Sequence, residues 1–238
     1  MKAIILAGGK GSRLGLEGLP KPMYKICGKP LLEHNLLLLK KHDVHHVCIA
    51  VQYIPEIIKN YFRDGSKLGI NIEYKEEETS LGTSGAVKNA KNFLDNKSFF
   101  VIYGDNFTNI NLSEMLKLHN SSNSIATIAL FDPNKSINSG IAGGYVSIDE
   151  KNRLVSFTEG GKNKSNGYKN YVNAGTYILE KEVLEKIPDG ISDFGKNIFP
   201  KLLQEGYKLS GYLTDSFVIA IDTKEALSKA EEAVGRND

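Results

Sequence analysis

The sequence LAGGKGSRLG at residues 6–15 begins where the apolar run AIILA at 3–7 ends, and this junction decides the fold class. A continuous apolar run of this kind predicts a strand buried on both faces of a parallel sheet. The loop after it contains Gly8, Gly9 and Gly11. Because glycine has no Cβ atom, backbone N–H groups can approach an anion closely there. We therefore expect an anion-binding loop at the carboxyl end of the first strand.

Fixed positive charge accompanies this loop. Arg13 lies within it, and the segment Lys21-Pro22-Met23 follows. Only four of the 30 Lys and Arg residues are Arg, so an arginine here favours a bidentate phosphate contact. Backbone amides beside fixed cations are typical of a triphosphate site.

Two common phosphate-binding motifs do not fit the loop. A P-loop requires two glycines separated by four residues and followed by Lys-Ser/Thr, which fails after Gly8 and after Gly9. The dinucleotide fingerprint requires Gly-x-Gly-x-x-Gly. After Gly9 and Gly11 the next glycine is Gly15, one residue late.

The composition limits the class of partner. The chain has 238 residues and a formal net charge of +2, which argues against nucleic acid or an anionic membrane as the partner. Its two cysteines, Cys27 and Cys48, are too few for a disulfide scaffold. No apolar stretch approaches the roughly 18 residues of a membrane span. We expect a cytoplasmic protein with reduced thiols.

Alternating strand and helix patterns predict an α/β fold with a mixed, mostly parallel sheet. In the first half we expect strands at 47–51, 70–74 and 98–103, a helix starting at Pro55, and a helix capped by Thr83. The second half suggests antiparallel strands, and Thr223 is a candidate cap for the last helix. We expect one domain over 1–238, with a nucleotide-binding half at about 1–110 and a sugar-phosphate half at about 111–238.

Further segments share a pattern with one known family. They are Lys21-Pro22-Met23, Gly28-Lys29-Pro30-Leu31, EEETSLGTSGAV (76–87), YGDNF (103–107), FTEGGK (157–162), VNAGTY (172–177) and AIDTKEAL (220–227). Together with the first loop they resemble the sugar-1-phosphate nucleotidyltransferases, from Met1 to about Ala233. The resemblance implies a Rossmann-like three-layer sandwich around a mixed seven-stranded sheet, the nucleotide-diphospho-sugar transferase fold. It also implies Mg²⁺-dependent transfer from an NTP to a sugar 1-phosphate, with release of pyrophosphate.

Two aspartates are candidate metal ligands. Asp105 and Asp222 each follow an apolar strand, so two strand ends could bring their carboxylates to one Mg²⁺, which prefers oxygen ligands. The resemblance assigns the same role to both. The usual family pattern at the second position is Asp-x-Gly-Thr, whereas this chain has Thr223 directly after the aspartate.

The resemblance also implies a nucleotide site. Gly82 would let the backbone meet the base, Thr83 could hydrogen-bond it, and Glu77 or Glu78 would face it. A carboxylate accepts two N–H groups, which suits guanine better than thymine or uracil, although a solvated strand end is the alternative for residues 76–78. The expected nucleotide-binding residues are Leu6, Ala7, Gly8, Gly9, Gly11, Ser12, Arg13, Lys21, Glu77, Gly82 and Thr83.

The resemblance places the acceptor sugar in the second half. Glu159 would accept hydrogen bonds from sugar hydroxyls, and Lys162 or Lys164 would hold the sugar phosphate. Asn173 and Gly175 would complete this site. The expected substrate-binding residues are Tyr103, Gly104, Asn106, Glu159, Lys162, Asn173 and Gly175.

Three residues are expected to act in the reaction itself. A sugar-phosphate oxygen attacks the α-phosphorus in line, so the protein must position two anions and offset their repulsion. Arg13 would steady the leaving β,γ-phosphates, Lys21 the α-phosphate, and Asp105 the metal. The resemblance is strongest to guanylyltransferases, which implies GTP with a mannose-type or D-glycero-D-manno-heptose 1-phosphate. A thymidylyl-, uridylyl- or cytidylyltransferase and a catalytically silent nucleotide-sugar sensor are the alternatives, and a homo-oligomer is possible.

Overall fold

The first apolar run forms strand β1 (Lys2–Leu6), which lies in the middle of the sheet. A computed structural model describes residues 1–11, 18–135, 144–160 and 168–235. Strands β4 (His46–Val51) and β6 (Phe99–Tyr103) pair with β1 on its two sides, both in parallel. Strand β5 (Asn71–Glu76) continues this parallel arrangement beyond β4. The sequence therefore predicted the parallel core of the sheet correctly.

The second half of the chain adds the antiparallel part. Strand β11 (Lys169–Leu179) runs antiparallel to β6 and to β8 (Ala126–Phe131), and β12 (Leu209–Leu213) pairs in parallel with β8. The order β12-β8-β11-β6-β1-β4-β5 is a mixed run of seven strands. The resemblance implied seven strands for the whole sheet, and the described sheet has two more. A hairpin of β9 (Tyr145–Ile148) and β10 (Leu154–Thr158) pairs with the first half of β11 and brings the described sheet to nine strands.

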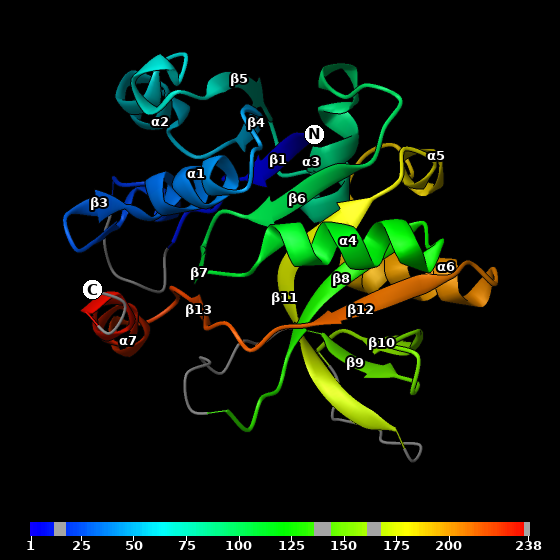
Figure 1. Ribbon diagram of the computed structural model, residues 1–238. Helices are drawn as coiled ribbons and strands as arrows, with labels where there is room; N and C mark the ends of the chain where they lie inside the picture. Colours follow the sequence, from blue (N-terminus) through cyan, green and yellow to red (C-terminus); the bar gives the residue numbers. More distant parts are fainter. Residues whose placement is uncertain (12–17, 136–143, 161–167, 236–238) are drawn as a thin grey trace.

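Helices cover both faces of the sheet (Figure 1). In β1, Ala3 and Ile5 belong to one buried cluster, and Ile4 belongs to the other. Helices α1, α2 and α4 contribute to the first cluster, and α3, α5 and α6 to the second. The helices are α1 (Leu31–Lys41), α2 (Pro55–Phe62), α3 (Gly82–Asn89), α4 (Leu112–Ser122), α5 (Val183–Lys186), α6 (Phe199–Gln204) and α7 (Lys224–Gly235). This alternation makes the three-layer sandwich that the sequence predicted.

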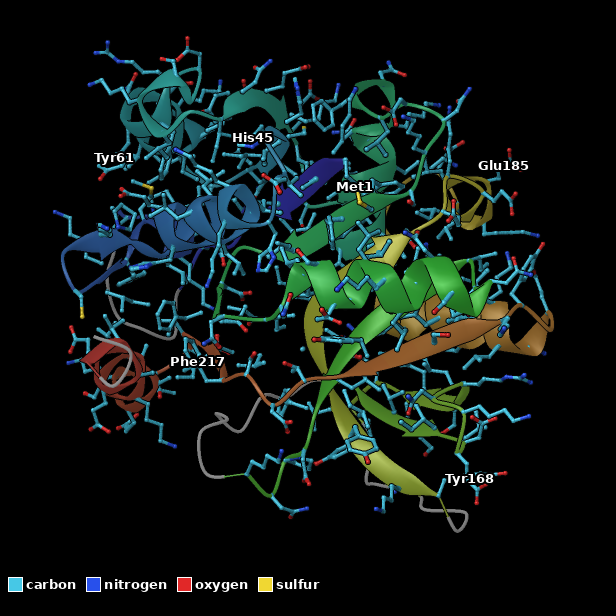
Figure 2. The ribbon with its side chains drawn as sticks, in the orientation of Figure 1. Met1, His45, Tyr61, Tyr168, Glu185 and Phe217 are labelled. Atoms are coloured by element: carbon cyan, nitrogen blue, oxygen red, sulfur yellow. The ribbon has the colours of Figure 1, made fainter. Side chains whose placement is uncertain are left out.

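A third buried cluster lies beside the sheet and joins distant parts of the chain. Strand β7 (Asn106–Thr108) pairs antiparallel with β13 (Val218–Ala220), and β2 (Lys25–Ile26) pairs with β3 (Lys29–Pro30). Phe217, which Figure 2 labels, lies against Phe107 with the ring planes tilted by 30°, and it packs with α7. Short 3₁₀ turns occupy Lys21–Met23, Ser66–Leu68 and Lys91–Phe93, and a π-helical turn at Phe194–Ile198 precedes α6.

The local predictions have mixed outcomes. Helix α2 begins at Pro55, as expected, and the Thr223 hydroxyl accepts the Ala226 N–H at 3.2 Å. The predicted cap by Thr83 is wrong. Helix α3 begins at Gly82, and the Thr83 side chain instead contacts residues near Asp193. Both cysteines are free thiols. A membrane-spanning helix is absent from the described part of the chain.

Candidate active site

One buried lysine joins the two aspartates that the sequence singled out. The Lys21 Nζ lies 2.7 Å from Asp105 Oδ2 and 2.6 Å from Asp222 Oδ1. The lysine side chain is almost fully buried, whereas those of Asp105 and Asp222 remain 37% and 36% exposed. Two carboxylate oxygens therefore converge on a single cation and keep one side open to a ligand.

Backbone contacts fix this arrangement. The Lys21 N–H donates to the carbonyl of Gly9 at 3.2 Å, and the Ile221 N–H donates to the carbonyl of Asp105 at 3.0 Å. A Cβ atom on Gly11 would lie 3.0 Å from the Lys21 Cβ. The glycine-rich loop thus packs directly on the lysine, and β7 and β13 hold the two aspartate loops together.

The negative charges of Asp105 and Asp222 stabilise the positive charge of Lys21. Burial alone would lower its pKa, but the nearby charges and hydrogen bonds of Asp105 and Asp222 outweigh burial and raise the pKa above its usual value. Lys21 is therefore a permanent cation at neutral pH.

The convergent carboxylates fit a divalent cation. Hard oxygen ligands suit Mg²⁺, which keeps phosphate oxygens and water in its shell. Among the described residues, no group of three or more His, Cys, Asp or Glu side chains has metal-binding geometry. A site with two protein carboxylates is compatible with this absence, because substrate oxygens and water would fill the other coordination positions of the ion.

A cavity of about 350 Å³ opens beside this cluster. The first strand, the glycine-rich loop and the start of α3 contribute to its walls. It is lined by Leu6, Gly8, Gly9, Pro22, Gln52, Glu77, Ser80, Gly82, Thr83, Ala86, Tyr103, Asp105 and Asp193. The structure thus brings most of the predicted nucleotide-binding residues together, whereas the predicted Ala7 is buried in the core.

Glu77 is one of the residues that line the cavity. Its Oε2 atom accepts the Leu81 N–H at 3.0 Å, which ties the carboxylate to the residue before α3. Burial raises the pKa of Glu77, and the Leu81 hydrogen bond offsets this only in part. Gln52 lies nearby, because a Cβ atom on Gly8 would be 3.2 Å from its Cβ. The sequence reasoning missed Gln52, whose place directly after β4 was the available signal.

Asp193 is a second residue that the sequence reasoning missed. Its Oδ1 atom accepts the Thr83 N–H at 3.1 Å and the Thr83 hydroxyl at 3.3 Å. The neighbouring Ser192 carbonyl accepts the N–H groups of Ser84 and Gly85. A loop from the second half of the chain therefore satisfies the free N–H groups at the start of α3.

Some of the predicted sugar residues lie in or against the aspartate loop. The Asn106 Nδ2 donates to the Ala174 carbonyl at 2.9 Å, and a Cβ atom on Gly175 would lie 2.9 Å from the Tyr103 Cγ. Glu159 is half-buried, and burial raises its pKa. Gly104 lies within the same loop, and its N–H donates to the Leu6 carbonyl at 2.9 Å.

Four predicted positions lie outside the described residues: Ser12, Arg13, Lys162 and Lys164. Their assignments come from the sequence alone.

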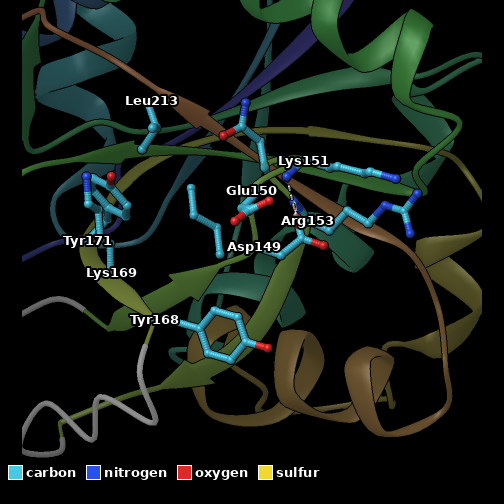
Figure 3. Close-up of a pocket in the computed structure, with 10 residues that line it drawn as sticks. Asp149, Glu150, Lys151, Arg153, Tyr168, Lys169, Tyr171 and Leu213 are labelled. Atoms are coloured by element: carbon cyan, nitrogen blue, oxygen red, sulfur yellow. Dashed lines mark hydrogen bonds between the residues drawn. The ribbon is translucent and has the colours of Figure 1, made fainter.

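A second hollow, of about 730 Å³, lies at the turn between β9 and β10 and contains none of the predicted residues (Figure 3). Asp149 Oδ1 accepts the backbone N–H groups of Lys151 and Arg153 there, so this carboxylate stabilises the turn.

Comparisons with known proteins agree with this geometry. The model of the nucleotidyl transferase family matches residues 2–228. A D-glycero-alpha-D-manno-heptose 1-phosphate guanylyltransferase from Campylobacter jejuni is 38% identical over 213 residues, which cover 87% of each chain. A mannose-1-phosphate guanylyltransferase from Mycobacterium tuberculosis is 35% identical over 230 residues, which cover 94% of this chain and 61% of the relative. This chain thus spans about three fifths of the mycobacterial protein.

A solved structure shares the whole architecture. HddC from Yersinia pseudotuberculosis, crystallised with GMP-PN, superposes with a TM-score of 0.77 at 26% identity and covers 98% of this chain and 99% of its own. The predicted nucleotide-diphospho-sugar transferase fold is therefore confirmed. The glycine-rich loop, the paired aspartates and the match over residues 2–228 agree, and the chain belongs to the nucleotidyl transferase family.

Proposed function

We propose that this protein transfers a nucleotidyl group from an NTP to a sugar 1-phosphate and releases pyrophosphate. The observation that carries the proposal is the Lys21 ammonium, held between Asp105 and Asp222 beside a cavity with glycine-rich walls. A buried cation and two convergent carboxylates suit a reaction in which two anions must be brought together.

Each of the site residues has a separate role in the proposed reaction. Lys21 contacts the α-phosphate, and Arg13 steadies the departing β,γ-phosphates. Asp105 and Asp222 would hold Mg²⁺, which supplies positive charge at the phosphates when bound. The acceptor phosphate oxygen attacks the α-phosphorus, and the bond between the α-phosphorus and the oxygen that bridges the α- and β-phosphates breaks. Pyrophosphate leaves with the electron pair of that bond. Lys162 or Lys164 draws the acceptor phosphate to this point.

GTP is the donor that the cavity favours. Guanine presents two neighbouring N–H donors, and a carboxylate accepts both, whereas thymine and uracil present one. Glu77 lines the cavity, and its Oε2 accepts the Leu81 N–H, which leaves further acceptor capacity on the same carboxylate. The relatives from Campylobacter and Mycobacterium are guanylyltransferases, which supports the same base.

A mannose-type or D-glycero-D-manno-heptose 1-phosphate is the proposed acceptor. Glu159 would bind sugar hydroxyls, and the segment Asn173–Gly175 lies against the loop that carries Asp105. The named activities of the same two relatives support these sugars.

The test is pyrophosphate release by the purified full chain with Mg²⁺, crossing GTP, CTP, UTP and dTTP with hexose and heptose 1-phosphates. GTP with one manno-configured acceptor is the expected pair. A strong pair with another base would overturn the guanine assignment and keep the reaction. If no combination releases pyrophosphate although the protein binds GTP, the result would favour a nucleotide-sugar sensor.

A further inference from the structure

Strand β11 is interrupted where it passes the aspartate loop. Its pairing with β8 shifts in register between Asn173 and Tyr177. Gly175 lies within this interval with a φ of +67°, a conformation that residues with a Cβ atom rarely adopt. The interval is therefore a bulge, and bulges often re-aim the groups next to an active site.

Asn173 uses both ends of its carboxamide to hold the bulge. Its Nδ2 donates to the Tyr177 hydroxyl at 2.8 Å, and its Oδ1 accepts the Gly175 N–H at 3.0 Å. Asn173 and Tyr177 are both buried. Both of these hydrogen bonds therefore join the Asn173 side chain to residues of its own strand.

The other side of the bulge is held by residues that flank Asp105 in sequence. Asn106 donates to the Ala174 carbonyl at 2.9 Å. The Tyr103 ring meets the Tyr177 ring edge-on at 5.6 Å between centroids. A Cβ atom on Gly175 would lie 2.6 Å from the Asn106 Nδ2. The backbone at 174–175 is therefore clamped between the residues before and after the aspartate loop.

Tyr103 extends this clamp to the nucleotide cavity, which it helps to line. Its hydroxyl also interacts with the side chains of Thr83 and Tyr177. A continuous set of contacts thus runs from the start of α3 through Tyr103 to the β11 bulge.

We propose that Tyr177 and Asn106 are positioning residues that lock the Asn173–Gly175 bulge against the Asp105 loop, and so present the acceptor sugar phosphate at a fixed place relative to the nucleotide. The inference rests on the proposed transfer to a sugar 1-phosphate. In it, Asn173 acts through the backbone of Gly175. Misplacement by about 1 Å can slow a reaction about 10²-fold, so small changes in this clamp have measurable effects.

The decisive variant is Tyr177→Phe. It keeps the aromatic ring and removes the hydroxyl that accepts a hydrogen bond from the Asn173 side-chain amide. We expect kcat/KM for the acceptor to fall at least about tenfold, with the KM for the nucleotide within about twofold of wild type. Hydrogen exchange of a peptide covering 172–177 becomes faster, because the Asn173 carboxamide that accepts the Gly175 N–H is no longer anchored by the Tyr177 hydroxyl. Asn106→Ala breaks the clamp from the other side and serves as the second variant if the first does not fold.

Tyr74→Phe is the matched control, because it deletes a tyrosine hydroxyl that donates to the Arg63 carbonyl at 2.7 Å, away from the site. We expect it to leave both KM values unchanged. Wild-type acceptor kinetics in Tyr177→Phe, or an equal loss for acceptor and nucleotide, would overturn the inference. If the wild-type protein makes no product, the proposed function fails, and hydrogen exchange alone decides whether Tyr177 locks the bulge.

Discussion

The Lys21 ammonium contacts the Asp105 carboxylate at 2.7 Å across a sequence separation of 84 residues. The contact places a fixed cation from the loop after β1 on a carboxylate from the loop after β6. Because β1 and β6 are parallel neighbours, the two loops emerge at the same edge of the sheet. The chemistry of the site depends on this adjacency.

Asp105→Asn tests the metal assignment. The substitution removes one of the two convergent negative charges and keeps the shape of the side chain. We expect pyrophosphate release to fall by about 10²–10³-fold, with the folded state retained. Asp215→Asn is the control, since this exposed aspartate pairs with Lys135 at the surface. Wild-type turnover by purified Asp105→Asn would exclude the carboxylate from the metal site.

Glu77 gives a pH dependence with a defined sign. Burial raises the pKa of this carboxyl. The proposed contact with guanine uses its charged form. Affinity for guanosine is therefore full above the raised pKa and is lost as the pH falls through it. Titration of guanosine binding between about pH 4.5 and 7.5 measures the effect. Glu77→Gln binds more weakly and abolishes the dependence, whereas substitution of the exposed Glu78 by Gln leaves it in place.

Asp193→Ala tests the loop that supports α3. Loss of the carboxylate frees the Thr83 N–H and hydroxyl at the wall of the nucleotide cavity. We expect the KM for the nucleotide to rise about tenfold, the size of one lost hydrogen bond. Asp189→Ala is the control, because Asp189 pairs with Lys88 at the surface just upstream. Equal kinetics for the two variants would contradict the role given to Asp193.

Gly82→Ala tests the close approach at the start of α3. A Cβ atom there would lie 2.5 Å from the Ser192 carbonyl oxygen, and the φ of +71° is unfavourable for alanine. We expect the free energy of unfolding to fall by about 3 kcal/mol. Gly206→Ala shares the positive φ but meets no atom within 4 Å, so its loss is about 1–2 kcal/mol. Chemical denaturation of both variants measures the difference.

Strand ends were the features that the sequence revealed best. Asp105 and Asp222 each follow an apolar run, and parallel strands bring such ends to one edge, so their convergence was expected. The way in which Asp222 reaches this edge was not expected, because the strand before it, β13, pairs with β7 outside the central sheet. Local patterns specify that a strand exists, but its partner depends on packing across the whole chain.

The contacts of Asp193 and Asn173 were beyond sequence reasoning for different reasons. Asp193 follows no apolar run, and its partner Thr83 lies 110 positions away. Thr83 itself looked like a helix cap, yet its hydroxyl accepts the Phe194 N–H at 2.9 Å. In a regular strand, successive side chains point to opposite faces of the sheet. This alternation breaks at the bulge in β11, so the face that the Asn173 side chain takes could not be predicted from it.

The link between the Asp105 loop and β13 has a consequence for the order of events during synthesis. Chains leave the ribosome from the N-terminus, so the glycine-rich loop, Lys21 and Asp105 emerge well before Asp222. A nascent chain that ends near residue 210 lacks β13 and Asp222, so of the two carboxylates that contact Lys21 it contains only that of Asp105. The complete cluster of one ammonium and two carboxylates therefore forms only after residue 222 has been synthesised.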